Sequence, residues 1–405
     1  MKITRTYLFS LTLLAALSLN VHKAAAQIPC GPSINPLQTL SINWPEFRFD
    51  PKHSGCNPYE HIVNASNVGS LEVKWQTPTQ FPMGRSPVLV NGALYTDDYA
   101  FNASTGALLW DSGLSISSEP TVVNGVEYVG GGQYPDTFLY ALNATNGEIL
   151  WAFPTGSTVS SSPTVVNGVV YFGSSDWNVY ALNAATGALL WKYTTQSYVD
   201  SSPAVANGMV YIGSSDHYLY ALDASSGSLV WKYMTFGVIQ SAPSVSGNNV
   251  YFGSSSPDLY FYALNATTGT LVWKSQMNPI GEGAVRNSPA VANGLVYVAD
   301  EYEYLYAFNA STGAVVWKYS PGPFNLENAS TVVANGVVYM TLLALDSVIA
   351  VDAHTGSQLW SYRGSENNSP ASPPIVANGV VYVVGTAGDV HNPTGVAWAF
   401  HLPGQ

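Results

Sequence analysis

The chain has 405 residues, of which 47% are hydrophobic and only 9% are charged, against roughly 25% charged residues in an average globular domain. The abundance of aromatic and β-branched residues excludes a disordered protein. A formal net charge of -12 argues against nucleic acids and anionic membranes as partners, because these partners attract basic surfaces.

Residues 1–26 have the pattern of a secretory signal peptide. Lys2 and Arg5 supply a positive start, an apolar stretch follows over residues 7–19, and the run Ala24–Ala26 offers a small-residue cleavage site. An uncleaved membrane anchor is the alternative interpretation. No later segment reaches the about eighteen apolar residues of a transmembrane helix. We therefore expect an exported protein, periplasmic or extracellular, without a membrane span.

Residues 27–70 form an N-terminal extension that contains both cysteines of the chain, Cys30 and Cys56. An exported protein with two cysteines favours a disulfide between them; two free thiols are the alternative. Two cysteines alone do not make a zinc site, and the histidines of the chain lack metal-binding spacing, so we expect no metal.

The remainder of the chain, residues 71–405, is a repeat. The phrase SSPTVVNGVVYFGSSDWNVYALNAATGALLWKY over residues 161–193 recurs almost unchanged over residues 201–233. One tryptophan marks each copy, with a mean spacing of about 41 residues, which lies in the range of propeller blades. These residues are Trp75, Trp110, Trp151, Trp191, Trp231, Trp273, Trp317 and Trp360.

Each repeat is predicted to contain four β-strands. A run such as VVNGVVY places β-branched residues on both sides of Asn-Gly, which adopts the positive φ angles of a type I′ hairpin turn. The first turns lie at Asn91-Gly92, Asn124-Gly125, Asn167-Gly168, Asn207-Gly208, Asn293-Gly294, Asn335-Gly336 and Asn378-Gly379, with Gly247-Asn248-Asn249 in the fifth repeat. A second hairpin turn ends at Gly106, Gly147, Gly187, Gly227, Gly269, Gly313, Gly356 and Gly395. Eight turns of each kind predict eight blades.

The last repeat lacks a fourth strand, because the chain ends shortly after the segment VAWAFHL. The segment LEVKW over residues 71–75 is an outer strand with no blade of its own. Pairing the two removes an open sheet edge that would invite aggregation. We therefore predict an all-β, eight-bladed β-propeller of four-stranded antiparallel blades, closed by the N-terminal strand. WD-type, kelch-type and open-solenoid repeats fit the sequence less well.

The spacing A-x-[ND]-x-x-[TS]-G-x-x-x-W occurs over residues 181–191 and again over residues 221–231. It resembles the tryptophan-docking motif of the pyrroloquinoline-quinone (PQQ) repeat family. The segment WPEFRFDPKHSG over residues 44–55 also resembles the lead-in of bacterial propellers in that family. The family includes PQQ-dependent alcohol dehydrogenases and cofactor-free outer-membrane assembly lipoproteins, so the resemblance implies the fold and leaves the activity open.

The repeated tryptophans and aspartates are expected to be structural. A large flat indole can pack between adjacent blades, and Trp44, outside the repeat, is expected to contribute less. Four blades carry an aspartate four residues before the third-strand tyrosine, namely Asp136, Asp176, Asp216 and Asp258. Recurrence with the blade favours hydrogen bonding within a turn over a ring of calcium ligands.

The candidate functional residues are those that break the repeat. Just before each innermost strand the consensus is Ser-Ser, and the eight strand starts converge on the channel mouth. The deviations are Arg85, Glu119, Asp200, Gln240, Arg286, Asn287 and Asn328. A structural repeat gains nothing from ionisable groups there, so we expect a ligand site, with Asp200 as the candidate catalytic residue. Ordinary variation at a solvated rim is the alternative.

The leading hypothesis is a non-enzymatic exported binding or scaffold protein, without a cofactor, whose partner at the channel mouth is a protein, a glycan or a small molecule. The alternative, which the family resemblance implies, is a PQQ- and calcium-dependent dehydrogenase of alcohols or sugars. For such an enzyme Glu119, Asn287 and Asp200 are imperfect positional matches to the metal ligands and base. The sequence has neither the adjacent-cysteine pair of some family members nor a C-x-x-C-H haem motif.

Overall fold

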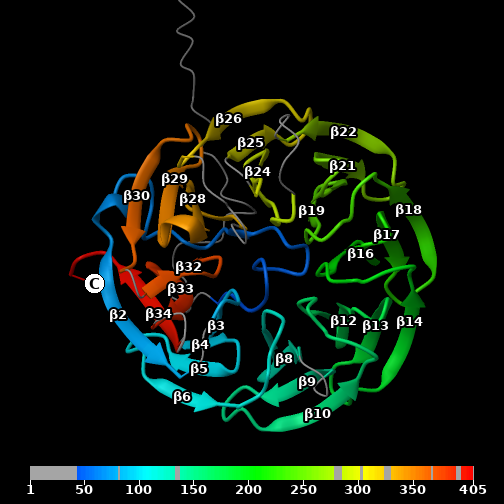
Figure 1. Cartoon of the computed structure of the whole chain (residues 1–405), viewed down its shortest axis with the longest axis horizontal. Helices are drawn as coiled ribbons and strands as arrows, with labels where there is room; N and C mark the ends of the chain where they lie inside the picture. Colours follow the sequence, from blue (N-terminus) through cyan, green and yellow to red (C-terminus); the bar gives the residue numbers. More distant parts are fainter. Residues whose placement is uncertain are drawn as a thin grey trace, which may run out of the picture.

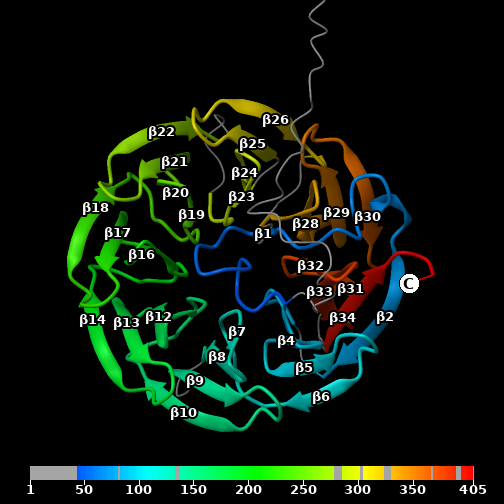
Figure 2. The ribbon, with the colours of Figure 1, turned by 180° about the vertical axis from the view of Figure 1, so that it is seen from behind.

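The computed structural model describes residues 43–80, 83–132, 137–277, 285–301, 304–322, 330–365, 368–388 and 394–404. The signal peptide, Cys30, Asp136 and Asn328 lie outside the described residues. The described strands form eight sheets that stand around a central axis like blades (Figures 1 and 2). The predicted all-β, eight-bladed propeller is confirmed. No helix among the described residues is long and apolar enough to cross a membrane.

Within each blade the strands run antiparallel and follow one another outward from the axis. The first four blades comprise β3 Val88–Val90, β4 Ala93–Thr96, β5 Tyr99–Asn102 and β6 Leu108–Asp111; β7 Thr121–Val123, β8 Val126–Gly130, β9 Phe138–Asn143 and β10 Ile149–Pro154; β11 Thr164–Val166, β12 Val169–Gly173, β13 Asn178–Asn183 and β14 Leu189–Thr194; and β15 Ala204–Ala206, β16 Met209–Gly213, β17 Tyr218–Asp223 and β18 Leu229–Met234.

The last four blades follow the same order, with additions at the ring closure. They comprise β19 Ser244–Ser246, β20 Asn249–Gly253, β21 Tyr260–Asn265 and β22 Leu271–Gln276; β23 Ala290–Ala292, β24 Leu295–Ala299, β25 Leu305–Asn309 and β26 Val315–Tyr319; β27 Val332–Ala334, β28 Val337–Leu342, β29 Ser347–Asp352 and β30 Gln358–Arg363, with β1 Cys56–Asn57; and β32 Ile375–Ala377, β33 Val380–Ala387, β34 Thr394–His401 and β2 Glu72–Thr79, with β31 Asn368–Pro370. Two short 3₁₀ turns, η1 Val68–Ser70 and η2 Leu343–Leu345, complete the described elements.

The hairpin turns follow the prediction except for the second turn of the last blade. The seven Asn-Gly turns have positive φ at both residues, for example 51° at Asn167 and 78° at Gly168, as a type I′ turn requires. The second turn of blades 1 to 7 has a glycine at positive φ, such as Gly187 at 70°. The prediction is wrong for Gly395, which lies inside strand β34. The reason is that the third and fourth strands of blade 8 come from opposite ends of the chain, so no hairpin joins them.

The ring closes as predicted. Strand β2 pairs antiparallel with β34, for example Trp75 opposite Ala399 and Thr77 opposite Ala397. Figure 1 shows β2, in blue, along the outer side of β34, in red. The N-terminal strand therefore supplies the outer strand that the last repeat lacks, and it covers the sheet edge that β34 would otherwise expose.

The repeated tryptophans join neighbouring blades. The Nε1 of Trp191 donates to the backbone oxygen of Ala224 in the next blade at 3.0 Å, and the hydroxyl of Tyr171 donates to the same oxygen at 3.1 Å. A Cβ atom on Gly227 would lie 2.6 Å from the indole ring, so glycine is required beneath it. Both bonds recur at seven of the eight junctions between blades.

Candidate functional site

The segment of residues 44–57, here named the plug, crosses the centre of the ring (Figures 1 and 2). It forms a hydrogen bond with the middle residue of every innermost strand. Backbone oxygens of the plug accept the N–H groups of Leu89, Val122, Val205, Val245, Val291 and Val333. In the two remaining blades the carboxyl of Glu46 accepts the N–H of Val165, and Asn57 donates to the oxygen of Val376 at 2.7 Å. The plug therefore satisfies inner strand edges that would otherwise lack partners.

The plug also revises what was expected of the N-terminal extension. Trp44 is only 1% exposed, exchanges two backbone hydrogen bonds with Leu89, and meets Phe49 edge-on with ring centroids 5.1 Å apart. This burial does not support the expectation that Trp44 contributes less to stability than the repeat tryptophans do. The described part of the extension is thus an integral part of the propeller.

Charged side chains of the plug are buried beneath the channel mouth. Burial raises the pKa of Glu46 well above its ordinary value and lowers the pKa of Arg48 to about 9, an effect that Asp50 and Glu119 partly offset. Burial and the neighbouring Arg48 lower the pKa of His53 to about 3, so its imidazole is neutral near pH 7. The Nη2 of Arg48 donates to the backbone oxygen of Pro289 in blade 6.

The residues before the innermost strands alternate in direction, as extended chain does. We number three mouth positions backward from the residue that precedes each innermost strand, which is usually a proline. The first position stands directly before that residue. Side chains at the second position face their own blade. There Ser161 accepts the N–H of Gly173 at 3.0 Å, and Ser241 accepts that of Gly253 at 2.9 Å. The first position carries serines that link blades: Ser202 accepts the N–H of Ser162 at 2.9 Å. The Ser-Ser consensus is therefore structural.

Residues of the first and third positions line most of a cavity of about 350 Å³ at the channel mouth, here named the cup. Arg85 is the exception, since it lines the cup from the second position of blade 1, two residues before Pro87. Five of the seven predicted residues lie around it: Arg85, Glu119, Asp200, Gln240 and Arg286. Phe47 of the plug also lines the cup and closes its inner end. The structure therefore brings together side chains that are up to about two hundred residues apart in sequence, from five different blades.

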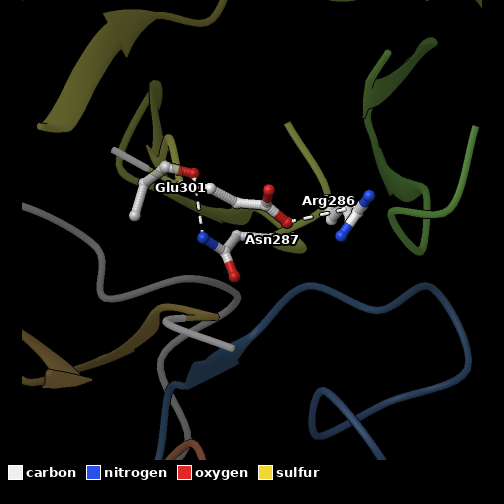
Figure 3. Close-up of polar contacts among 4 residues, drawn as sticks. Arg286, Asn287 and Glu301 are labelled. Carbon is white, nitrogen blue, oxygen red and sulfur yellow. Dashed lines mark hydrogen bonds and ion pairs between the residues drawn. The ribbon is translucent and has the colours of Figure 1, made fainter. Parts of the chain in front are cut away.

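Asn287 does not line the cup. It occupies the second position, is 2% exposed, and donates from Nδ2 to the backbone oxygen of Ala299 in its own blade at 3.3 Å (Figure 3). It thus takes the place of the buried consensus serine. The alternation of extended chain, had it been applied to the sequence, would have separated Asn287 from its neighbour Arg286.

Each acidic residue of the cup is held by a serine hydroxyl. Ser175 donates to Oδ1 of Asp200 at 2.7 Å, and Ser162 donates to Oε2 of Glu119. Glu119 lies two residues closer to its strand than Asp200 does, which places it about 6–7 Å deeper along an extended chain. This depth agrees with its electrostatic influence on Arg48 of the plug.

The two cations of the cup differ in their surroundings. The Nε of Arg286 lies 3.5 Å from Oε1 of Glu301, which follows β24 of the same blade, and the Arg286 side chain is 52% exposed (Figure 3). Arg85 lies near Asp97, whose pKa is raised to about 6 by burial although the guanidinium acts against the shift. Both guanidinium groups therefore lie near a carboxylate of their own blade.

The repeated aspartates behave as predicted for a structural role. Asp176 accepts the hydroxyl of Tyr180 at 2.7 Å and the N–H of Gly156 at 2.8 Å, and Asp216 repeats both bonds with Tyr220 and Gln196. These carboxylates fix loops between blades and do not converge on a common point.

A family model described as the outer membrane protein assembly factor BamB matches residues 99–260 and 257–395. The chain belongs to this family. The resemblance to the PQQ-repeat propellers that the sequence indicated is confirmed. Among curated proteins, none matches this sequence.

Three solved structures show how widely the fold is shared by members of this and related families. The quinohemoprotein alcohol dehydrogenase from Comamonas testosteroni is 15% identical, with a TM-score of 0.73, 90% of this chain covered and 81% of that one. A europium-containing methanol dehydrogenase is 14% identical, with a TM-score of 0.72 and coverages of 89% and 98%. BamB from Moraxella catarrhalis is 17% identical, with a TM-score of 0.62 and coverages of 83% and 98%. At these identities the likeness establishes the fold alone.

The cup does not present the ligand set that calcium and PQQ would require. Calcium takes six to eight oxygen ligands, usually with several converging carboxylates. Among the described residues no group of three or more His, Cys, Asp or Glu side chains could hold a metal ion. Glu119 and Asp200 come from blades 2 and 4, at different depths, and Asn287 faces its own blade. Glu119 and Asp200 therefore share the cup, but Asn287 does not join them there.

Sequence reasoning missed the plug and Phe47 at the end of the cup. The available signal was local charge density: the segment 44–55 holds Glu46, Arg48, Asp50 and Lys52 within a few residues, although only 9% of the chain is charged. Charges gathered in one segment of a weakly charged chain indicate a position where buried polar groups find specific partners.

Proposed function

We propose that this protein is an exported, non-enzymatic propeller that binds a small polar ligand in the cup at its channel mouth. The observation that carries the proposal is the composition of the cup, where five blades replace consensus serines or their neighbours with Arg85, Glu119, Asp200, Gln240 and Arg286. The serine consensus already satisfies the hydrogen bonds between blades. Apart from Glu119, which acts on the buried Arg48 of the plug, the deviations therefore add charge to the cavity without being needed for the ring.

The size and shape of the cup support a small ligand over a folded protein. Its volume of about 350 Å³ falls at the lower end of the range for small-molecule pockets, roughly 300–1,000 Å³. Charges in a concave site act more strongly than on a convex surface, because field lines are focused there and water is partly excluded.

The test is a variant that restores the repeat. Replacing Arg85, Glu119, Asp200, Gln240 and Arg286 together by serine returns the cup to the consensus while keeping the hydrogen bonds that first-position serines form between blades. We expect this variant to keep the fold, since consensus residues are compatible with it, and to lose no more stability than the removal of Glu119 near the buried Arg48 costs. Thermal-shift and calorimetric panels of glycans, peptides and metabolites should give ligands for the wild type alone. Ligands bound equally by both proteins would place the site elsewhere.

Export is part of the proposal and rests on the pattern of residues 1–26. N-terminal sequencing of the protein recovered from the periplasm or medium should begin at or near Gln27. A mature protein that retains the apolar stretch would favour the membrane-anchored alternative.

A second candidate is a PQQ-dependent alcohol or sugar dehydrogenase, which the fold similarity to the Comamonas testosteroni enzyme supports. Reconstitution with calcium and PQQ, followed by absorption spectra and a dye-linked oxidation assay, separates the two candidates. We expect no stoichiometric uptake of the quinone and no turnover, because the cup lacks a converging carboxylate set.

A further inference from the structure

Three successive blades place an acid, an amide and a cation at one and the same mouth position. Asp200, Gln240 and Arg286 each stand three residues before the proline that precedes the inner strand of blades 4, 5 and 6. Because the register is identical, the three side chains form an arc along one wall of the cup, and all three line the cavity. The charge along this arc changes from negative to positive across a neutral hydrogen-bonding group.

We propose that this arc binds a short peptide by its two charged termini, with the ammonium group at Asp200 and the carboxylate at Arg286. The inference rests on the proposed function, since it names the ligand class of the cup. Gln240 lies between the two charged residues and supplies an amide for a peptide bond of the ligand. The cavity of about 350 Å³ accommodates a di- or tripeptide but not a folded protein.

The contacts of the two charged residues suit this assignment. Ser175 donates to Oδ1 of Asp200, so within the described part of the chain Oδ2 is the oxygen left to accept an ammonium. Glu301 contacts Arg286 at Nε, 3.5 Å away, which leaves the two terminal nitrogens of the guanidinium to form the paired hydrogen bonds that a carboxylate prefers. Asp200 is thus oriented by the neighbouring blade and Arg286 by its own blade, and each keeps a binding edge that no described residue contacts.

The balance of charge favours a zwitterion over other small ligands. The cup contains two cations, Arg85 and Arg286, and two anions, Glu119 and Asp200, so a ligand with a single net charge would face repulsion from one pair. A neutral sugar would find hydroxyl partners but would offer no cation to Asp200, at a cost that grows in a partly enclosed site. A zwitterionic ligand places an ammonium group beside the anions of the cup and a carboxylate beside its cations.

The test compares trialanine with two blocked forms and with a neutral molecule. N-acetyl-trialanine lacks the ammonium, trialanine amide lacks the carboxylate, and maltotriose carries no charge. We expect calorimetry to detect binding of trialanine, or native mass spectrometry to detect bound members of a mixed pool of di- and tripeptides. Each block should weaken binding about tenfold or more, as loss of a charged hydrogen-bond partner does.

Single substitutions assign each terminus to its residue. Asp200→Asn should abolish the preference for a peptide with a free N-terminus over one with an acetylated N-terminus. Arg286→Gln should abolish the preference for a peptide with a free C-terminus over one with an amidated C-terminus. Ser160→Ala is the matched control, because Ser160 lines the cup at the same position in blade 3 and should change neither preference. Circular dichroism melts confirm that each variant folds.

Two outcomes overturn the peptide assignment. One is the absence of binding by trialanine and the peptide pool up to millimolar concentration; the other is equal binding of free and blocked peptides. If maltotriose or another neutral ligand binds instead, and the five-serine variant loses it, the proposed function stands while the peptide assignment falls. If the five-serine variant keeps every ligand, the proposed function falls as well.

Discussion

The indole nitrogen of Trp360 donates to the backbone oxygen of Leu71 over 3.3 Å, across 289 positions of the sequence. This bond lies at the junction between blade 7 and blade 8, where the hydroxyl of Tyr339, unlike its counterparts at the other junctions, has no hydrogen-bond partner among the described residues. Of the two hydrogen bonds that the tryptophan and tyrosine form at the other seven junctions, the junction between blades 7 and 8 therefore keeps one among the described residues, and we expect this junction to open first.

Deletion of residues 71–77 should cause the protein to aggregate. The deletion removes most of the strand that pairs with β34 and exposes an unpaired edge able to recruit other chains. Light scattering and sedimentation against the full chain measure the effect. Trp360→Phe serves as the milder control, because it removes the bond to Leu71 and leaves the strand paired. A deletion variant that stays monomeric and melts like the wild type would refute the closure argument.

Trp191→Ala should cost about 3–5 kcal/mol of unfolding free energy, as truncation of a large buried aromatic does. The substitution opens a cavity above Gly227 and removes the donor to Ala224. Trp44→Ala should cost a similar amount, because Trp44 is 1% exposed against 9% for Trp191. Urea denaturation compares the two. A Trp44 variant as stable as the wild type would show that the plug does not contribute to the ring.

Glu127→Val should stabilise the protein near neutral pH by about 1–3 kcal/mol, the cost of a buried polar group without a hydrogen-bond partner. Glu127 is fully buried, and neither carboxyl oxygen has a hydrogen-bond partner among the described residues. The corresponding residue is Val170 in blade 3 and Val210 in blade 4. Burial, reinforced by Asp98, raises the pKa of Glu127 well above its ordinary value.

The stabilisation by Glu127→Val should grow with pH. The folded protein holds a proton on Glu127 more tightly than the unfolded chain does, so the wild type loses stability as the pH rises above about 4.3 toward the folded pKa. The valine variant lacks this loss. Denaturation at about pH 5 and about pH 8 measures the difference. An equal difference at both values, or a less stable valine variant, would mean that Glu127 has a partner in solution.

The repeat determined how much of the fold could be predicted from sequence. Asn-Gly pairs, a tryptophan in every blade and the unmatched strand at each end led to the blade number and the closure, because local turn chemistry and strand pairing suffice for these features. Gly395 was misassigned because a glycine near the expected position resembles a turn residue. Its true setting depends on which strand supplies the edge of blade 8.

The site could be predicted only in part, for a physical reason. Asp200 and Arg286 were identifiable because they break the consensus at the same position of the repeat. The propeller brings that position of every blade to the channel mouth. The plug was not identifiable as such, since its contacts to eight blades are long-range and leave no periodic signal. Ligand identity depends on the directions of side chains around the cup, which sequence position does not specify.

Formation of a Cys30–Cys56 disulfide stays a prediction, because Cys30 lies outside the described residues. Cys56 is 1% exposed in β1, which pairs with the innermost strand β27, and no described cysteine is a free thiol. Closing a loop of about 25 residues should stabilise the protein by roughly 3 kcal/mol. Peptide mapping under non-reducing conditions decides the pairing, and reduction should lower the melting temperature. Two thiols open to alkylation in the exported protein would rule it out.

The last prediction concerns Arg48 in the plug and Glu119 in the cup, which should be coupled in stability. Burial lowers the pKa of Arg48 to about 9, and Glu119 is one of two carboxylates that act against this shift. Removing Glu119 leaves a buried cation with less compensation, so Glu119→Gln should destabilise the protein by about 1–3 kcal/mol. Asp200→Asn should not, because Asp200 stands about two residues further from the plug at the rim. In the Arg48→Met background the effect of Glu119→Gln should largely vanish, giving a coupling of at least about 0.5 kcal/mol in a double-mutant cycle. Additive effects of the two substitutions would show that Glu119 serves the ligand alone, and that the cup and the plug are independent.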